Sequence, residues 1–357
     1  MKKIGKQSRK NIADMPKVEL HLHFEGSVGP DLLARIAAGG HGVAKGEIER
    51  LYNFRNFQEF LAAYGRVNEL LRSPGDFYQV ARALVERLAS QHILYAEITY
   101  TPLIHTRLGL DHAQIMASII RGCAERSEEN TPRLSFIYDT VRQWGSQAAL
   151  ETVALAIADR RAGLPVVGFG VGGNELSVPA FELEEAFRLA HSAGLGRFVH
   201  AGEVGGPESV WEAVEILGAE RIGHGIAAMR DPMLLCMLRE KGIALDICPT
   251  SNVRTGVVES FESHPLPGLI SSGVAVTLGS DDPGFFGVWL EDELERSAGT
   301  WDWDLGTVIE LQKNAVFHSF LNDREKTALA ASLKKRIARP EKYMKDESGQ
   351  GSGNRQP

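Results

Sequence analysis

Short apolar runs recur along the chain, and longer segments with helical periodicity separate most of them. Several runs are rich in Val, Ile, Phe and Tyr, residue types that favour β-strands. Eight of the runs are predicted to be strands: residues 18–24, 93–101, 134–140, 166–170, 198–201, 221–223, 244–248 and 274–280.

The segments between the predicted strands carry helix signals. Three of the clearest are residues 181–193, 208–217 and 232–241. The third has Asp231 as its candidate N-cap and Gly242 just past its end, in the order expected for helix start and stop signals. Strands that alternate with helices form a parallel sheet, and eight of them suit a closed barrel. The sequence therefore predicts an α/β fold, a (β/α)8 TIM barrel.

The connection between the first two predicted strands, about residues 25–92, is long and has its own helical pattern at residues 57–71. Long insertions at the catalytic face of a barrel often act as lids, so we expect a helical lid after strand 1. A stripe at helical spacing fits either ordinary core packing, the favoured interpretation, or a hydrophobic gate over a ligand. It consists of Phe57, Phe60, Leu61 and Tyr64.

Composition and charge restrict the classes of function. Of the 357 residues, 43% are hydrophobic and 24% charged, and the net charge is −7. This charge argues against a nucleic-acid or anionic-membrane partner and leaves a small-molecule partner. No run approaches the roughly 18 apolar residues of a membrane helix, and the basic start lacks the apolar core of a signal peptide, so a cytoplasmic location is expected.

We expect a single catalytic barrel domain at residues 1–342 and a polar, disordered tail at residues 343–357. Cys123, Cys236 and Cys248 have no close ligand-like spacing and are expected to be reduced, buried thiols. The oligomeric state is left open.

The residues that carry chemistry lie at the ends of predicted strands. Active sites of barrel enzymes lie at the C-terminal face, and positions i and i+2 of a strand point the same way. Four strands would thus direct histidines and carboxylates toward one mouth: His21, His23, His200, Glu203, His224, Asp281 and Asp282. Each alone could be structural, as we expect for His191, His264 and His318, but their convergence indicates a metal site.

Four segments carry a resemblance to a known family, and they run in the family's order. They are Pro16–His23 (PKVELHLH), residues 200–203 (HAGE), 221–225 (RIGHG) and 280–283 (SDDP). On these segments the chain resembles the adenosine deaminase family of the amidohydrolase superfamily. The resemblance implies a metal-dependent hydrolase that removes the amino group of a 6-aminopurine compound.

The resemblance also implies one zinc ion per chain, held by His21, His23, His200 and Asp281. Three nitrogen donors and one carboxylate suit zinc and leave a position for water, whose pKa zinc lowers toward about 7. The order of Cys248 and Pro249 does not fit the cysteine-ligated deaminase class.

The family positions imply the remaining roles. His224 would orient the water, accept its proton and stabilise developing charge, and Glu203 would protonate ring N1. Asp282 would contact N7, and the backbone N–H of Gly173 would contact N3. Glycines 172 and 173 also fit an ordinary strand-exit turn, which is compatible with this contact.

Three departures bear on the substrate. Glu25 stands where animal-type members have the Asp that binds the ribose 5′-hydroxyl, and Gly170 and Asn174 replace acidic residues. These features look more like bacterial branches of the family, including adenine deaminases and aminodeoxyfutalosine deaminases. Arg142, just past strand 3, fits either a structural arginine or a clamp for a substrate carboxylate.

The leading prediction is therefore deamination of aminodeoxyfutalosine, with Glu25 near the sugar and Arg142 on the carboxylate. The alternatives are adenosine, free adenine, and a catalytically inactive relative that only binds a purine. A binuclear hydrolase is disfavoured because the fourth predicted strand, residues 166–170, contains no lysine.

Overall fold

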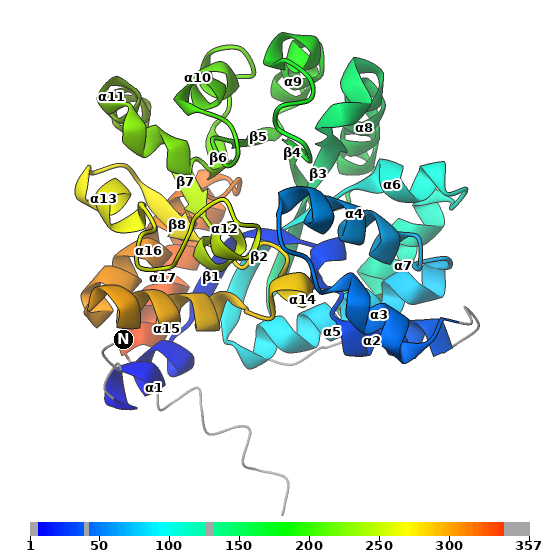
Figure 1. Cartoon of the computed structure of the whole chain (residues 1–357), viewed down its shortest axis with the longest axis horizontal. Coiled ribbons are helices and arrows are strands. Elements are labelled where there is room, and N and C mark those ends of the chain that lie inside the picture. Colours follow the sequence, from blue (N-terminus) through cyan, green and yellow to red (C-terminus); the bar gives the residue numbers. More distant parts are fainter. Residues whose placement is uncertain (1–5, 39–42, 126–130, 339–357) are drawn as a thin grey trace, which may run out of the picture.

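The computed structural model describes residues 6–38, 43–125 and 131–338 of the chain (Figure 1). Within them, eight strands form one parallel sheet whose spatial order follows the sequence. The strands are β1 (Lys17–His23), β2 (Ile93–Tyr100), β3 (Arg133–Val141), β4 (Val166–Gly172), β5 (Gly196–Ala201), β6 (Arg221–His224), β7 (Ala244–Ile247) and β8 (Val276–Leu278). All eight predicted strands are confirmed, with ends shifted by no more than two residues.

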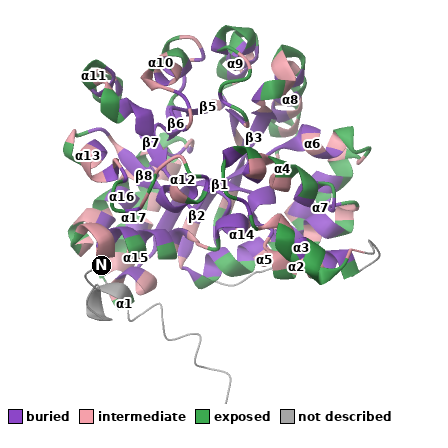
Figure 2. Cartoon of the chain, in the orientation of Figure 1, coloured by how far each residue is buried: buried purple, intermediate pink, exposed green. Residues whose placement is uncertain are grey.

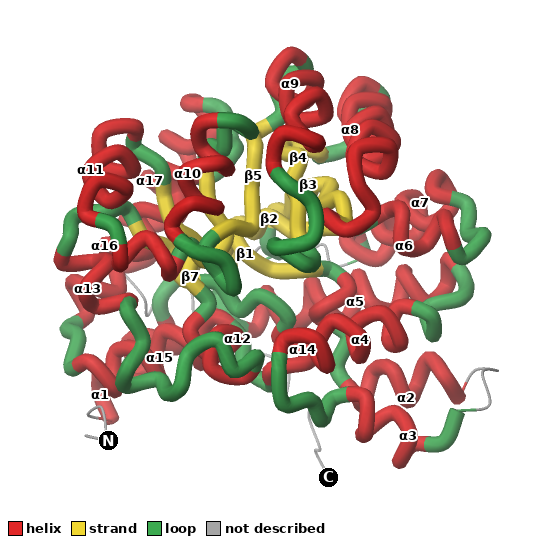
Figure 3. Tube along the Cα trace, turned by 45° about the horizontal axis from the view of Figure 1, so that its top comes forward, coloured by secondary structure: helices red, strands yellow, loops and turns green. Residues whose placement is uncertain are grey.

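The ring closes between β1 and the residues that follow β8. The backbone N–H of His23 donates to Asp281 O at 2.8 Å, and Asp281 N–H donates to His21 O at 3.0 Å. Figure 3 shows the strands at the centre, surrounded by helices. The fold is therefore the predicted TIM barrel, and the barrel closes at residues predicted to bind metal.

Helices cover the outside of the barrel. The α-helices are α1 (Lys6–Asp14), α2 (Pro30–Ala38), α3 (Lys45–Leu51), α4 (Phe57–Asn68), α5 (Pro74–Ser90), α6 (Pro102–Arg107), α7 (His112–Ala124), α8 (Gly145–Arg161), α9 (Glu184–Ser192), α10 (Pro207–Glu215), α11 (Pro232–Lys241), α12 (Pro249–Arg254), α13 (Leu266–Ser271), α14 (Pro283–Phe286), α15 (Leu290–Trp301), α16 (Leu305–His318) and α17 (Asp323–Ala338). Short 3₁₀ helices are η1 (Glu25–Ser27), η2 (Arg142–Trp144), η3 (Ala180–Leu183) and η4 (Ile226–Arg230).

The insertion after β1 is helical, as predicted, and contains α2 to α5. Figure 2 shows buried residues on the strands and exposed residues on the outer sides of the helices. Among the described residues, no helix is long and apolar enough to span a membrane. The predicted tail at residues 343–357 lies outside the described part of the chain. All three cysteines were expected to be buried. Cys248 is buried, whereas Cys123 and Cys236 are partly exposed.

A buried ionic network fills the barrel below the site. Arg221 is fully buried and pairs with Glu97 at 2.7 Å and with Asp246. Its guanidinium also donates to Leu20 O and His318 O. Buried charges persist only when they are paired and hydrogen-bonded in this way. The network ties β1, β2, β6 and β7 together beneath the strand ends that carry the site.

Candidate active site

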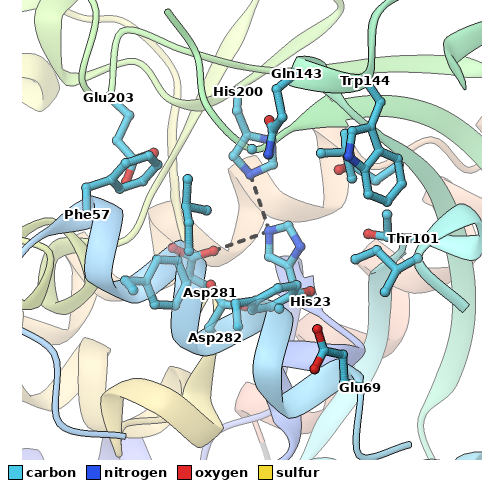
Figure 4. A pocket seen from close by; sticks show the side chains of 18 of the residues that line it. His23, Phe57, Glu69, Thr101, Gln143, Trp144, His200, Glu203, Asp281 and Asp282 are labelled. Carbon is cyan, nitrogen blue, oxygen red and sulfur yellow. Dashed lines mark hydrogen bonds and ion pairs between the residues drawn. The ribbon is translucent and has the colours of Figure 1, made fainter. Parts of the chain in front are cut away.

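A cavity of about 310 Å³ opens at the C-terminal ends of the strands, where barrel enzymes carry their active sites. Its wall includes most of the predicted site residues: His23, Gly173, His200, Glu203, His224, Asp281 and Asp282. Figure 4 labels five of them, namely His23, His200, Glu203, Asp281 and Asp282. His21 lies beneath them, fully buried. The structure thus brings together all the side chains proposed for metal binding and catalysis.

Four side chains present metal donors at matching distances. The His200 Nε2 atom lies 3.1 Å from His21 Nε2 and 3.3 Å from His23 Nε2. Asp281 Oδ1 lies 3.3 Å from the Nε2 atoms of both His21 and His23. Donors held about 2.0–2.1 Å from one tetrahedral ion are separated by roughly 3.3 Å. These four separations suit a tetrahedral metal ion. Donor atoms of His224 also lie within 4.8 Å of those of His21, His200 and Asp281, so His224 borders the same cluster.

The second nitrogens of two imidazoles fix the direction of the first. His21 Nδ1 lies 3.2 Å from Asp246 O, and His200 Nδ1 lies 3.0 Å from Val171 O. A carbonyl oxygen only accepts, so each Nδ1 carries the proton and each Nε2 presents a lone pair to the donor cluster. Metal-binding histidines are oriented in the same way by outer hydrogen bonds.

The electrostatics of the cluster favour a cation. Burial lowers the pKa of His23, but Asp282, Asp281 and Asp139 raise it more strongly, to about 10. A positive charge among the imidazoles is therefore held by nearby carboxylates. Burial, with His21 and His23, lowers the pKa of His200 well below its usual value, which keeps its lone pair available.

Two site residues have left-handed backbone conformations. His224 has φ of 61° and Asp281 has φ of 60°. Such angles cost free energy for residues other than glycine and concentrate at functional sites. At the ends of β6 and β8 they aim the two side chains into the barrel mouth.

Glu203 and Asp282 are buried carboxyl groups beside the donor cluster. Burial and the charge of Asp281 raise the pKa of Glu203 well above its usual value, which favours the protonated form of this carboxyl. Burial and Asp281 also raise the pKa of Asp282. Glu203 Oε1 lies 3.7 Å from His224 Nε2, and Asp282 Oδ1 has no protein partner in the described structure. Both carboxyls are available to a ligand.

The loop that carries Glu203 is held by Glu175, a functional residue that no sequence motif indicates. The Glu175 carboxylate accepts the backbone N–H groups of Gly202, Glu203, Val204 and Gly205, the last three at 3.1, 2.9 and 3.0 Å. Four converging N–H groups stabilise an ionised carboxylate. Glu175 therefore positions the backbone from which Glu203 enters the site.

We expect Glu175→Gln to lower both the free energy of unfolding and kcat. One oxygen becomes an NH₂ group facing N–H donors, and a hydrogen bond to a charged group contributes about 1.5–3 kcal/mol. Urea unfolding should show a loss of that size, and kcat should fall about 10-fold with the metal retained. The exposed Glu182→Gln is the control. Wild-type stability and kcat in both variants would contradict this role.

Asp139, on β3, is a second site residue that the sequence analysis missed. Its side chain lines the cavity, is 4% exposed, and has an unpartnered Oδ1. A Cβ at Gly170 or Gly172 would lie 2.8 Å from one of its oxygens, so two glycines of β4 make room for it. Position 170 has a glycine where animal-type members have an acidic residue, and the Asp139 carboxylate from the neighbouring strand β3 lies beside it. Burial raises the Asp139 pKa to about 7.

Arg142 is not brought together with the other predicted residues. It lies in η2, is 5% exposed, and donates to Val178 O at 3.3 Å and His200 O at 3.4 Å. It is absent from the cavity wall. Arg142 is therefore placed as a structural arginine, which hydrogen-bonds the end of β5, and not as a clamp for a substrate carboxylate.

Glu25 is also held by the protein. Its Oε1 accepts from Thr101 N–H and from His105 Nε2, each at 3.0 Å, and Tyr64 O–H lies 3.4 Å from Oε2. The side chain is fully buried and is absent from the cavity wall. Tyr64 and Thr101, which both contact Glu25, line the cavity.

Helix α4 forms one wall of the cavity. Its apolar stripe both packs in the core and faces the ligand space, the two roles considered from the sequence. Phe57, Phe60, Leu61 and Tyr64 all line the cavity (Figure 4 labels Phe57). Phe60 also packs on the rings of Phe285 and Phe286, with centroids 5.5 and 5.2 Å away. The stripe therefore joins the lid insertion to the core and faces the ligand space.

A TIM barrel with three histidines and an aspartate clustered at the C-terminal ends of its strands, beside a buried carboxyl group, is the arrangement of a metal-dependent hydrolase. The family model for adenosine deaminase matches residues 16–336. The chain belongs to the adenosine deaminase family, and it is a metal-dependent hydrolytic deaminase rather than a non-catalytic relative.

Individual relatives agree with this membership. The chain is 37% identical over 333 residues to the aminodeoxyfutalosine deaminase of Streptomyces avermitilis, covering 92% of this chain and 93% of that one. The crystal structure of an adenine deaminase from Arthrobacter aurescens is 30% identical, with a TM-score of 0.84, 91% of this chain and 99% of that chain covered. An amidohydrolase from Burkholderia ambifaria with bound Zn shares the fold, with a TM-score of 0.86 at 23% identity over 96% and 95% of the two chains.

Proposed function

We propose that the chain is a zinc-dependent deaminase of 6-aminopurine nucleosides, in which His21, His23, His200 and Asp281 hold one zinc ion. The observation that carries the proposal is the set of donor separations of 3.1–3.3 Å among these four residues, with Glu203 alongside. Zinc, when bound, lowers the pKa of a coordinated water toward about 7 and so supplies hydroxide at neutral pH.

The protein's own groups account for the rest of the reaction. Oxygen adds to C6 of the purine as the Glu203 carboxyl gives its proton to N1, which lets the ring accept electrons. The C6–N bond then breaks, and ammonia leaves with a proton that the added oxygen gives up. The other proton of the water restores the Glu203 carboxyl, so the residue ends the cycle as it began. Asp282 faces N7 and the Gly173 backbone N–H faces N3, so that the base is fixed along its edge. Water and the 6-aminopurine thus yield the 6-oxopurine and ammonia.

Within this class, aminodeoxyfutalosine is the leading substrate, and two observations support it. The Streptomyces avermitilis relative named for it is 37% identical. The cavity wall also carries one arginine, Arg107, whose Cζ lies 4.0 Å from the centroid of the Trp144 ring. No carboxylate of the described residues pairs with this exposed guanidinium. Arg107, not Arg142, is the group available to a substrate carboxylate at the mouth.

We expect Arg107→Gln to lower kcat/KM for aminodeoxyfutalosine about 10-fold and to leave adenosine within about 2-fold. A guanidinium matches a carboxylate bidentately, and adenosine has no carboxylate to bind. Arg121→Gln is the control, because Arg121 stacks on Tyr78 in the same manner away from the cavity. An equal loss of kcat/KM for both substrates would show that Arg107 does not recognise the carboxylate.

Adenine deaminase is the second candidate, favoured by the 30% identity to the Arthrobacter aurescens enzyme of that name. Comparison of kcat/KM for aminodeoxyfutalosine, adenosine and adenine with the wild type separates the candidates. Preference for aminodeoxyfutalosine is the expected result. A preference for adenine would make adenine deaminase the correct assignment, and a preference for adenosine would favour plain adenosine deaminase.

A further inference from the structure

Two buried residues lie behind His224 and take no part in the reaction as described above. Asn252 on α12 is fully buried, and its amide Nδ2 lies 3.2 Å from His224 Nδ1. Its Oδ1 lies 3.2 Å from Nε2 of His264, which is 3% exposed. The backbone N–H of Leu266 donates to His264 Nδ1 at 3.1 Å. These contacts form one chain of hydrogen bonds that ends at His224.

The direction of this chain follows from its fixed end. A backbone N–H only donates, so His264 Nδ1 must accept, and burial lowers the His264 pKa to about 4, so the ring is neutral. A neutral imidazole has one proton, which therefore lies on Nε2 and is donated to Asn252 Oδ1. The Asn252 Nδ2 group then donates to His224 Nδ1. His224 Nδ1 accepts this hydrogen bond and carries no proton, so the proton of the His224 ring lies on Nε2.

We infer that Asn252 and His264 are positioning residues that hold His224 in the tautomer with its proton on Nε2. The inference rests on the proposed function, because it gives His224 its part in the deamination. Nε2 faces Glu203 Oε1 and Asp281 Oδ2, each 3.7 Å away, where the oxygen and C6 meet. His224 therefore donates a hydrogen bond to the attacking oxygen and neither gains nor loses a proton. This removes the role of proton acceptor that the family resemblance implied.

The test reads the tautomer directly. Nitrogen-15 NMR of the zinc-loaded protein, labelled at histidine, distinguishes a protonated ring nitrogen from one with a free lone pair. His224 signals are assigned by their loss in His224→Gln. We expect Nδ1 without a proton and Nε2 with one. A proton on His224 Nδ1 in the wild type would overturn the inference, and this measurement needs no substrate, so it is independent of the proposed activity.

Asn252→Asp reverses the direction of the hydrogen bond to His224, and the side chain keeps nearly the same shape. A carboxylate only accepts, so the His224 proton should move to Nδ1 and the donor toward the attacking oxygen is lost. Loss of one such donor costs about 10²–10³-fold in rate. We expect kcat to fall by that factor, with KM within a few-fold and zinc content unchanged. Asn314→Asp, which replaces a half-buried amide bonded to Val276 O, is the matched control. Equal kcat in the two variants would overturn the inference.

Discussion

Glu203→Gln is expected to lower kcat by about 10²–10⁴-fold while the protein retains its metal. The amide has the shape of the carboxyl but cannot give a proton to N1, and general acid–base steps contribute a factor of that size. Glu203 lies in the cavity wall, and burial together with Asp281 raises its pKa, which favours the protonated form that a proton donor needs. Steady-state kinetics and elemental analysis of the same preparation measure both quantities.

The exposed Glu208→Gln, on α10, is the control for replacing a carboxyl group with an amide. Activity of Glu203→Gln within a few-fold of wild type would contradict the assignment of Glu203 as the proton donor. Loss of zinc in this variant would instead place Glu203 among the metal ligands.

Asp281→Ala is expected to lose the metal and, with it, the activity. Three imidazoles would remain, but the one carboxylate whose Oδ1 lies 3.3 Å from two of them would be gone. Wild-type protein should contain about one zinc ion per chain. Its melting temperature should fall on chelation, because an ion that binds only the folded state stabilises that state.

The neighbouring residue supplies the matched comparison. Asp282→Ala should retain about one zinc ion per chain and lose most of its kcat, because its carboxyl faces the ligand. Two metal ions per wild-type chain, or full activity of metal-free protein, would contradict the mononuclear mechanism. If Asp281→Ala retained zinc, Asp281 would not be the fourth ligand, and Asp282 would be the next candidate.

The barrel could be predicted because each strand is a local feature of the sequence. Residues at strand ends inherit their direction from the strand, so His21, His23 and His200 could be placed at one mouth before the structure was known. The helix predicted at residues 181–193 was right in part, since its first turn is the 3₁₀ helix η3 and α9 begins at Glu184. The sequence pattern does not distinguish these two kinds of first turn.

The direction of Arg142 could not be predicted for a related reason. The strand β3 ends at Val141, and Arg142 begins a 3₁₀ helix, so the alternation of a strand no longer applies. Its guanidinium turns to the carbonyls of Val178 and His200 instead of the cavity. Arg107 reaches the cavity from α6, at a distance in sequence that no local pattern relates to the site.

Glu175 and Asp139 escaped prediction because their roles depend on tertiary contacts. Glu175 binds backbone groups about 30 residues later in the chain, and such groups have no sequence signature. For Asp139, a signal was present: the glycines at positions 170 and 172 leave space that a neighbouring side chain must fill.

The central claim is metal-dependent hydrolytic removal of the 6-amino group, and the release of ammonia tests it most directly. Zinc-loaded protein incubated with aminodeoxyfutalosine, adenosine or adenine should release one ammonia per purine converted from at least one of them. Chelation should abolish the release, and added zinc should restore it. Absence of ammonia from all three compounds with zinc-loaded, folded protein, or release that is unaffected by chelation, would contradict the account.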